Sequence, residues 1–231
     1  MNKIHLIGGE KGGVGKSVVA RVVAQYMIDE SIPFLGFDAD PSHGSFVRFY
    51  REYASLAAVG SYESLDAIVE AAVDYPDKRV LVDLAAQTHE PLARWMEDSG
   101  VLETAAELNV SFYYWHVMDP GKDSVDLLKK LLDCFGAQLN YVIVLNQLRG
   151  ENFNLFNRSG EWERLLGPNG QRITLKYLHQ PIMNKIDAGS MSFGAAISRT
   201  APEGNGLRQL ERQRVKVWLT DAYGQLDTVE I

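Results

Sequence analysis

The sequence predicts an α/β fold, with a doubly wound, mostly parallel sheet that has helices on both faces. Short, nearly continuous apolar runs alternate with segments of helical spacing, which is the pattern of buried parallel strands joined by helices. A glycine-rich loop directly follows the first apolar run, as expected where a ligand lies beyond the end of a strand. The 231 residues contain no internal repeat or linker, so we expect a single domain over residues 1–231 with a substantial core.

Six apolar runs are the expected strands, because each is short and bounded by turn residues or by a helical segment. Helices are expected where apolar residues recur at three- and four-residue spacing. The predicted strands are Lys3–Gly8, Pro33–Asp38, Arg79–Leu84, Val110–Val117, Tyr141–Asn146 and Arg172–Tyr177. The predicted helices between them are Lys16–Glu30, Tyr62–Val73, Glu90–Leu108 in two pieces, and Asp123–Phe135.

The last third of the chain is less regular. Asn, Ser, Gly and Pro are frequent at about 150–170, which predicts an irregular insertion around a short helix at Glu161–Leu166. Apolar residues from Leu207 to Leu226 have helical spacing. They predict a C-terminal helix at about 204–226 that packs onto the sheet.

The composition is that of a globular protein, with 46% hydrophobic and 23% charged residues. No apolar stretch approaches the ~20 residues of a membrane span, and the first strand begins too early to leave room for a signal peptide. The single cysteine, Cys134, lies in an amphipathic run and is predicted to belong to the core. These features favour a cytoplasmic location, and the five histidines do not have the spacing of metal ligands.

The segment from Glu10 to Ser17 reads Glu-Lys-Gly-Gly-Val-Gly-Lys-Ser and has the residues of a phosphate-binding loop. Its three glycines let successive backbone N–H groups point at phosphate oxygens, and the helix that follows directs the positive end of its dipole at them. Lys16 can then reach the terminal phosphates, and the hydroxyl of Ser17 can bind Mg²⁺. We therefore predict that the chain binds and hydrolyses a nucleoside triphosphate.

The loop departs from the general pattern G-x-x-x-x-G-K-[ST], because Glu10 occupies the first glycine position and a second lysine, Lys11, follows it. The string K-G-G-x-G-K-[ST] resembles the deviant loop of the ParA/MinD family of ATPases. This resemblance implies a P-loop NTPase fold, with ATP and Mg²⁺ as the bound groups. The residues it implies as nucleotide contacts are Gly12, Gly13, Val14, Gly15, Lys16, Ser17 and Val18.

Two strand ends carry carboxylates. The second predicted strand ends in Asp38-Ala-Asp40-Pro, which resembles the D-x-D-P segment of ParA-type ATPases. That resemblance implies that Asp40 orients the attacking water or a metal-bound water, with Asp38 in support; a turn in which an aspartate caps the next helix is the alternative. The third predicted strand ends in Asp83, the Walker B position that holds Mg²⁺. The expected magnesium ligands are therefore Ser17, Asp40 and Asp83.

The residues after Asp83 depart from the resembled family, which usually has proline or glycine there. This chain has Leu-Ala-Ala-Gln-Thr at residues 84–88, so the second switch is expected to move differently. Gln87 stands where some GTPases place a glutamine that orients water, or it caps the next helix.

Asn146 ends the fifth predicted strand. In ParA-like proteins an asparagine at this place hydrogen-bonds the adenine edge, because an amide offers both a donor and an acceptor. The residues 146–149 read Asn-Gln-Leu-Arg rather than the N-K-x-D of a GTPase, so ATP is favoured over GTP. The loop at Met118–Gly121 has no assigned role.

Lys11 corresponds to the lysine that crosses a dimer interface in the resembled family, so Lys11, Lys16 and Asp40 are the expected catalytic residues. Two subunits docked loop to loop would bring Lys11 and Lys16 of each into one water-poor space, which is unfavourable without counter-charge. Two ATP molecules supply that charge. ATP is therefore expected to favour a homodimer, and hydrolysis to reverse it.

The resemblance implies a slow ATPase that drives partition, positioning or mobilisation of DNA or protein cargo, with a partner protein that stimulates hydrolysis. Partition-type members bind DNA non-specifically through basic residues. The net charge of −7 opposes binding to nucleic acid over the whole molecule, and membrane targeting is disfavoured because the last residues are acidic. The candidates for a local DNA-binding patch, or for a solvated helix face, are Arg208, Arg212, Arg214 and Lys216.

Two other function classes stay open. A metabolic ATP-dependent enzyme on the same scaffold would show turnover that rises with a small carboxylate substrate, although a reductase would need more cysteines than Cys134. A regulatory binding module that has lost hydrolysis is suggested by Ala85 and Ala86. Such a module would bind Mg-ATP without releasing phosphate.

Overall fold

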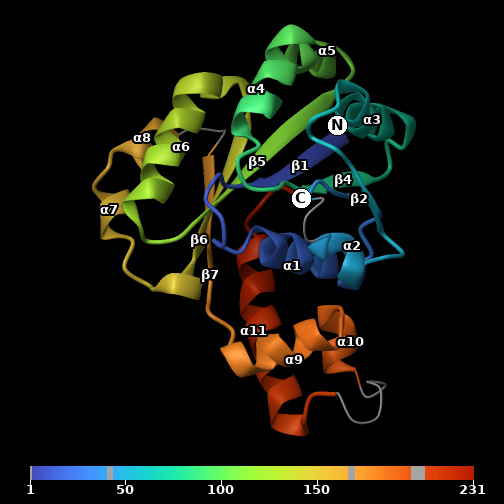
Figure 1. The fold of residues 1–231 in the computed structure, drawn as a ribbon, viewed down its shortest axis with the longest axis vertical. Coiled ribbons are helices and arrows are strands. Elements are labelled where there is room, and N and C mark those ends of the chain that lie inside the picture. Colours follow the sequence, from blue (N-terminus) through green and yellow to red (C-terminus); the bar gives the residue numbers. More distant parts are fainter. Residues whose placement is uncertain (1, 41–43, 166–169, 199–205) are drawn as a thin grey trace.

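Seven parallel strands form one sheet in the order β3-β2-β4-β1-β5-β6-β7 (Figure 1). The structure is a computed structural model that describes residues 2–40, 44–165, 170–198 and 206–231. The six predicted strands are all present, with ends that differ by one or two residues. The edge strand β3 was not predicted, because it has three residues that are half-buried or exposed. The strands are β1 Asn2–Gly8, β2 Phe34–Asp38, β3 Ala54–Leu56, β4 Arg79–Asp83, β5 Val110–Met118, β6 Asn140–Asn146 and β7 Gly170–Leu175.

Helices cover both faces of this sheet, which confirms the predicted doubly wound α/β class (Figure 1). Four short helices that the sequence did not predict are α2, α7, α9 and α10. The helices are α1 Lys16–Asp29, α2 Ser45–Phe49, α3 Tyr62–Asp74, α4 His89–Asp98, α5 Val101–Glu107, α6 Lys122–Phe135, α7 Asn154–Asn157, α8 Glu161–Leu165, α9 Gln180–Ala188, α10 Phe193–Ile197 and α11 Gln209–Leu226.

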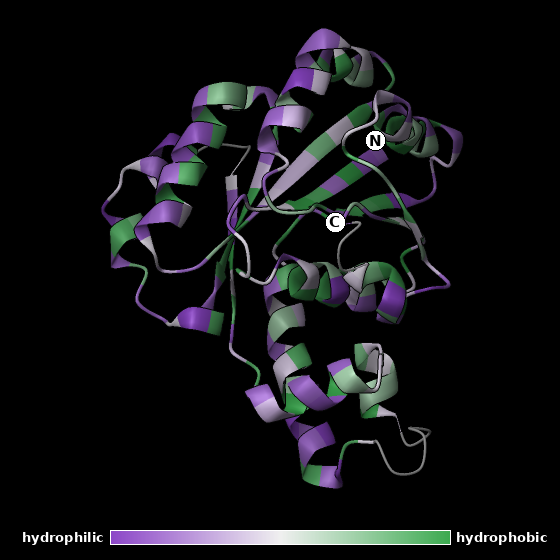
Figure 2. Cartoon of the chain, in the orientation of Figure 1, coloured by the Kyte–Doolittle hydropathy of each residue, from purple (hydrophilic) through white to green (hydrophobic). Residues whose placement is uncertain are grey.

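The side chains of each strand alternate between two separate cores. On one face, Ile7 and its neighbours pack against α1, α2 and α9–α11. On the other face, Leu6 and its neighbours pack against α3–α8. Figure 2 shows apolar helix faces turned toward the sheet and polar faces turned outward.

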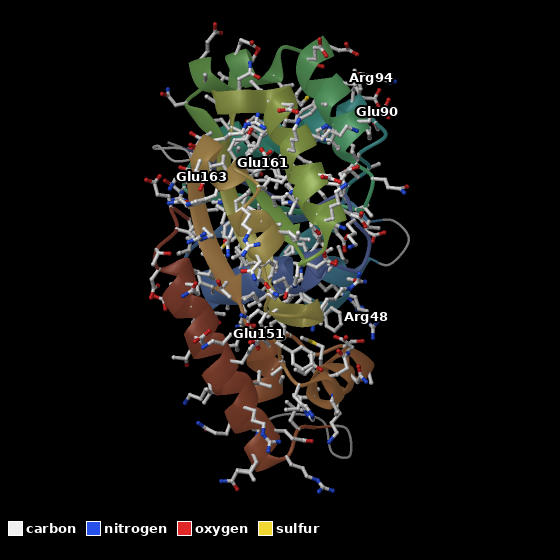
Figure 3. The ribbon with its side chains drawn as sticks, turned by 90° about the vertical axis from the view of Figure 1, so that its left-hand side faces the viewer. Arg48, Glu90, Arg94, Glu151, Glu161 and Glu163 are labelled. Atoms are coloured by element: carbon white, nitrogen blue, oxygen red, sulfur yellow. The ribbon has the colours of Figure 1, made fainter. Side chains whose placement is uncertain are left out.

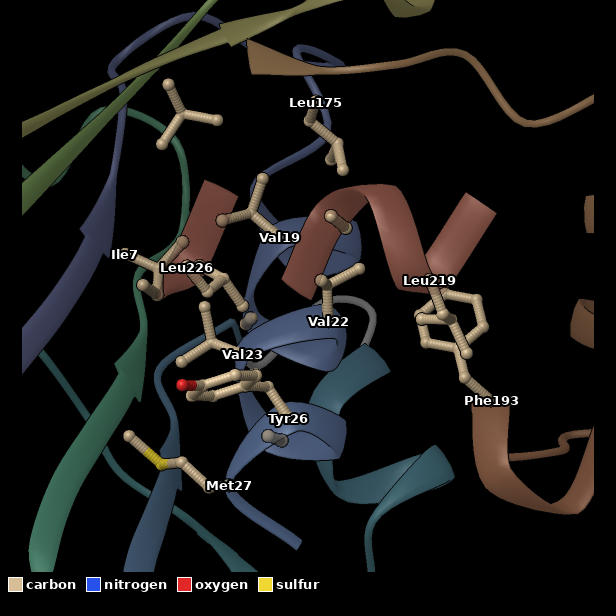
Figure 4. Packing of buried hydrophobic residues seen from close by; sticks show 14 of the residues in the cluster. Ile7, Val19, Val22, Val23, Tyr26, Met27, Leu175, Phe193, Leu219 and Leu226 are labelled. Carbon is tan, nitrogen blue, oxygen red and sulfur yellow. The ribbon is translucent and has the colours of Figure 1, made fainter. Parts of the chain in front are cut away.

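Helix α1 is buried along most of its length, between the sheet and α11. Figure 4 shows Val19, Val22 and Val23 of α1 facing Ile7 of β1 and Leu226 of α11. A helix enclosed in this way is apolar on nearly every side. Because the phosphate-loop candidate leads directly into α1, this packing fixes the direction in which the helix N-terminus points.

The last third of the chain is more ordered than the sequence indicated. Helix α10 packs against α11 beyond the edge of the sheet, and α9 is joined to α11 by the ion pair of Lys185 with Glu211 (Figure 1). Arg48 of α2, labelled in Figure 3, donates from Nε to the hydroxyl of Ser190 at 2.8 Å and so joins the two parts. The buried guanidinium of Arg21 lies 2.9 Å from a carboxylate oxygen of Asp187 and 3.6 Å from the ring centroid of Phe49.

One prediction, the burial of Cys134 in α6, needs correction. Cys134 is exposed, because it lies beside the apolar stripe of α6 rather than on it. The short helix predicted at Glu161–Leu166 is present as α8, and α7 is a further short helix in the segment 150–165; the two helices bury Phe156 and Leu165 in the second core. Leu166 and residues 167–169 of the same prediction lie outside the described residues.

Candidate nucleotide site

The candidate phosphate loop lies between β1 and α1, at the carboxyl edge of the sheet. β1 pairs with β4 on one side and with β5 on the other, so the chain changes direction across the sheet at this strand. Ligands of doubly wound sheets bind at such a switch point. The structure therefore places the loop where a ligand is expected.

The loop has the backbone conformation that its glycines permit. Gly13 and Gly15 have φ values of 71° and 95°, a region that other residues rarely adopt. Gly15 is the residue before the first turn of α1. A Cβ atom added to Gly12 would have no neighbour within 4 Å, so the backbone of the loop is open on this side.

Lys16 lies against its own loop. Its ammonium donates to the carbonyl of Lys11 at 3.3 Å, and the residue is only 8% exposed. Burial lowers the pKa of Lys16, and the carboxylates of Asp83, Asp40 and Glu10 oppose this shift. These carboxylates favour the protonated, positively charged form of Lys16. Lys16 lies at the N-terminus of α1, a place that also attracts phosphate oxygens.

Asp83 is a buried carboxylate at the end of β4. Within the described residues, neither of its oxygens makes a hydrogen bond of normal geometry. Burial raises the pKa of Asp83 to about 7; Asp38 and Asp40 add to the rise, whereas the hydroxyl of Ser17 and the ammonium of Lys16 oppose it. A carboxylate in this state is a ready ligand for a cation, because binding replaces the water that burial removed.

Asp38 and Asp40 have different surroundings. The carboxylate of Asp38 is fully buried and accepts from the backbone N–H groups of Asp40 at 3.1 Å, Phe46 at 2.7 Å and Val47 at 3.0 Å. It therefore positions Asp40 and caps α2, as the alternative interpretation of this segment expected. Asp40 is half-buried near Lys16 and Asp83. Pro41 of the D-x-D-P pattern lies outside the described residues.

Lys11 makes an intramolecular ion pair. Its ammonium lies 3.0 Å from Oδ2 of Asp119 and 3.6 Å from the exposed carboxylate of Asp123. Asp119 also accepts from the hydroxyl of Ser124 at 2.7 Å, and the hydrogen bonds from Ser124 and Lys11 lower its pKa although burial opposes this. No role was predicted for the loop that carries Asp119. The sequence feature that could have identified Asp119 is its position as a carboxylate directly after the buried strand β5.

Asn146 ties the phosphate loop to β6. Its amide nitrogen donates to the carbonyl of Val14 at 2.7 Å, and its oxygen accepts from the N–H of Leu148 at 3.2 Å. One amide hydrogen and one oxygen lone pair stay available for a base. Arg149 was not predicted to belong to the site, yet its guanidinium nitrogen lies 2.6 Å from where a Cβ of Gly13 would be.

The residues present fit a magnesium–triphosphate group. The buried oxygens of Asp83 need a partner, and the Ser17 hydroxyl and the Lys16 ammonium lie beside them. The described residues contain no group of three or more His, Cys, Asp and Glu side chains that could hold a metal by themselves. A metal at this site therefore depends on oxygen atoms from the ligand, as is usual for Mg²⁺.

Comparisons with known proteins agree with this fold. No protein-family model matches the chain. It is similar to Protein MobD of Acidithiobacillus ferrooxidans, with 27% identity over 230 residues that cover 98% of this chain and 97% of that protein. It is also similar to Protein TraL of Escherichia coli, with 24% identity over 245 residues that cover 100% of both chains. A ParA family ATPase from Chlorobium tepidum TLS matches in structure with a TM-score of 0.50 at 16% identity, over 94% of this chain and 98% of that chain.

The chain has a ParA-type P-loop fold. The resemblance to the ParA/MinD family seen in the loop thus extends to the arrangement of the whole sheet. The signal recognition particle receptor FtsY from Elizabethkingia anophelis matches with a TM-score of 0.51 at 13% identity; the match covers 94% of this chain and 65% of that one. In the described part of this ParA-like chain, no helix combines the length and the apolar character that a membrane crossing requires.

Proposed function

We propose that this chain is a ParA-like ATPase that binds Mg-ATP, forms an ATP-dependent sandwich homodimer and hydrolyses ATP slowly. The observation that carries the proposal is the carboxylate of Asp83, which is buried without a hydrogen bond of normal geometry among the described residues and lies next to Lys16 and Ser17. Such a group is costly to keep in the folded protein. A bound cation, held in turn by phosphates on the loop, would compensate it.

The nucleotide would be held by the loop backbone from Gly12 to Gly15, by Lys16 and Ser17, and by Val18 in the first turn of α1. Ser17, Asp83 and Asp40 would hold Mg²⁺, directly or through water. When bound, Mg²⁺ supplies positive charge next to the transferred phosphoryl group. Asp40, positioned by Asp38, would orient the attacking water.

Lys11 would reach the nucleotide of a second subunit, and Asn146 would contact the base. In the monomer, Lys11 is held by Asp119, so dimerisation requires this pair to open. ATP, as an additional anion at the interface, would provide the alternative partner. Hydrolysis would remove that partner and so release the dimer, with a partner protein stimulating the step. We propose that the cytoplasmic chain uses this cycle in partition, positioning or mobilisation of DNA or protein cargo.

The proposal is tested first by nucleotide binding. Isothermal titration calorimetry with Mg-ATP should show binding by the parent and a loss of at least tenfold in affinity for Lys16→Ala. Lys122→Ala removes an exposed lysine of α6 and should bind like the parent. A parent chain that does not bind Mg-ATP at millimolar concentration would contradict the proposal.

Dimerisation and hydrolysis are tested next. With ATP, Asp40→Ala should form a stable dimer in light scattering, because it binds nucleotide without turnover. A Lys11→Ala variant that dimerises as well as the parent would refute the role of Lys11 across the interface.

A regulatory module without hydrolysis is the second candidate function. The segment 84–88 differs from the resembled pattern, and Gln87 in it is exposed with φ of 60°. Binding of Mg-ATP without phosphate release, also with a partner protein, would support this candidate over the ATPase.

A further inference from the structure

Glu10, which departs from the general phosphate-loop motif, contacts the segment 84–89, where the chain departs from the ParA/MinD pattern. Glu10 replaces the first glycine of the general phosphate-loop motif, and residues 84–88 replace the usual second switch. The carbonyl of Glu10 accepts from the N–H of Gln87 at 3.4 Å. The side-chain oxygen Oε1 of Glu10 accepts from the N–H of His89 at 2.5 Å. Neither contact is part of the nucleotide chemistry described above.

The contact with His89 is a helix cap supplied from a distant part of the chain. His89 is the first residue of α4, and Thr88 before it makes no side-chain cap. The first N–H groups of a helix have no partner within the helix, and a carboxylate there is also favoured by the helix dipole. Glu10 is half-buried, so its hydrogen bond is partly protected from competing water.

A carboxylate at this position would otherwise oppose the function of the loop. Glu10 is close enough to Lys16 to oppose the lowering of its pKa, and it would repel a phosphate that approached on the same side. Directing Oε1 to the N-terminus of α4 gives the charge a partner. The geometry therefore accounts for an acidic residue inside a phosphate-binding loop.

We propose that Glu10 is a positioning residue that couples the phosphate loop to α4, so that nucleotide on the loop and the position of α4 depend on each other. The proposal rests on nucleotide binding at the loop, as proposed above. Its consequence extends along α4, because Trp95 of this helix is buried and donates from its indole N–H to Asp66 of α3 at 2.8 Å. Coupling between two sites acts equally in both directions.

The test uses the full chain with 5-fluorotryptophan in place of tryptophan, and follows Trp95 by fluorine NMR with and without Mg-ADP. Amide hydrogen exchange at His89 is measured on the same proteins. The variants are Glu10→Ala, Glu10→Gln and Glu90→Ala. Glu90 is a matched control, since it is an exposed carboxylate in the same first turn of α4 that pairs with Arg94 at 3.3 Å (Figure 3).

We expect Mg-ADP to shift the Trp95 signal in the parent and in Glu90→Ala, and to shift it much less in Glu10→Ala. Without nucleotide, the His89 amide should exchange roughly 2- to 30-fold faster in Glu10→Ala, the usual effect of losing a cap. Glu10→Gln keeps an acceptor oxygen and should restore most of both readouts. It also serves as the second variant if Glu10→Ala does not fold.

Three results would overturn the coupling. They are a Trp95 signal that does not shift in a parent that binds Mg-ADP, a shift on Mg-ADP binding that is as large in Glu10→Ala as in the parent, and a loss of the shift in Glu90→Ala as great as the loss in Glu10→Ala. A parent that does not bind nucleotide would contradict the proposed function and the coupling together. In that case faster exchange at His89 in Glu10→Ala would still identify the cap, so the two failures are distinguishable.

Discussion

The ammonium of Lys11, in the glycine-rich loop after β1, lies 3.0 Å from a carboxylate oxygen of Asp119, the residue that directly follows β5. The side chain of Asp119 is only 6% exposed and that of Lys11 is 26% exposed, so the pair is more than a surface contact. If Lys11 acts on the nucleotide of a second subunit, Asp119 competes with that nucleotide for the same ammonium. The pair then sets how readily ATP produces the dimer.

Asp119→Asn is predicted to strengthen the ATP-dependent dimer. The substitution removes the charge that holds Lys11 and keeps an oxygen for Ser124, so the fold should be preserved. Weakening a partly buried pair of this kind is worth about 1 kcal/mol in each of the two subunits, or about 30-fold in the dissociation constant of the dimer. Sedimentation of Asp40→Ala and of the Asp40→Ala, Asp119→Asn double variant with ATP measures the difference.

The matched control is Asp123→Asn, which removes the exposed carboxylate 3.6 Å from Lys11 and should change the dimer little. Equal dissociation constants with and without Asp119→Asn would mean that the ion pair does not limit dimerisation.

Asp83 is predicted to make both stability and magnesium binding depend on pH. Burial raises its pKa to about 7 from 3.8, so between these values the folded protein keeps a proton that the unfolded chain has lost. Unfolding then releases a proton, and the free energy of unfolding falls as the pH rises from about 4 to about 7, by at most about 4 kcal/mol. Asp83→Asn should lack this fall and be more stable than the parent at pH 8 without Mg²⁺.

The measurement is chemical denaturation of parent and Asp83→Asn at pH 5, 6, 7 and 8 without metal. For the parent with a bound nucleotide, magnesium affinity should rise about tenfold per pH unit below pH 7, because the cation displaces the proton. A pH-independent difference in stability between the two proteins would contradict this account.

Asp38→Ala is predicted to destabilise the protein by about 2–3 kcal/mol. Asp38 is fully buried and accepts three backbone hydrogen bonds, from Asp40, Phe46 and Val47. Its removal leaves these three donors, of which that of Phe46 is buried, without this acceptor. Asp38→Asn keeps one oxygen and should lose less stability. Because Asp38 contributes to the raised pKa of Asp83, the asparagine variant should also lower the pH at which magnesium binding changes. Urea unfolding and magnesium titrations against pH test the two effects separately.

The parts of the molecule that follow from local rules were predictable from the sequence. Six strands were identified because buried parallel strands have continuous apolar runs, and the loop between β1 and α1 because its glycines permit one backbone geometry. Helix α2 was missed because its N-terminus is held by Asp38, eight residues before Phe46. The contacts of Lys11 with Asp119 and of Glu10 with His89 join segments 108 and 79 residues apart. Such pairs depend on the order of the strands, which periodicity does not determine.

The basic residues in and just before α11 give the last prediction. Arg208 and Arg214 are exposed and Arg212 is half-buried, whereas Lys216 lies exposed further along the same helix. They form a short positive segment on a chain of net charge −7, so any attraction to DNA would be local and sensitive to salt. If ATP dimers bind DNA through this segment, changing the four residues to alanine should weaken binding at low salt. It should also reduce the slope of log K against log salt by about 0.9 for each phosphate that the variant no longer neutralises.

The slope is measured by fluorescence anisotropy of a labelled DNA duplex of arbitrary sequence. The protein carries Asp40→Ala, so that the ATP dimer is stable, and binding is titrated in the presence of ATP at several salt concentrations. The control changes Arg94, Lys122, Lys129 and Lys130 on α4 and α6 to alanine, which alters the net charge by the same amount at another surface. If both quadruple variants lose affinity equally, the effect comes from overall charge, and α11 is not a DNA-binding element. If only the α11 variant loses affinity, the segment binds DNA in spite of the acidic remainder of the chain.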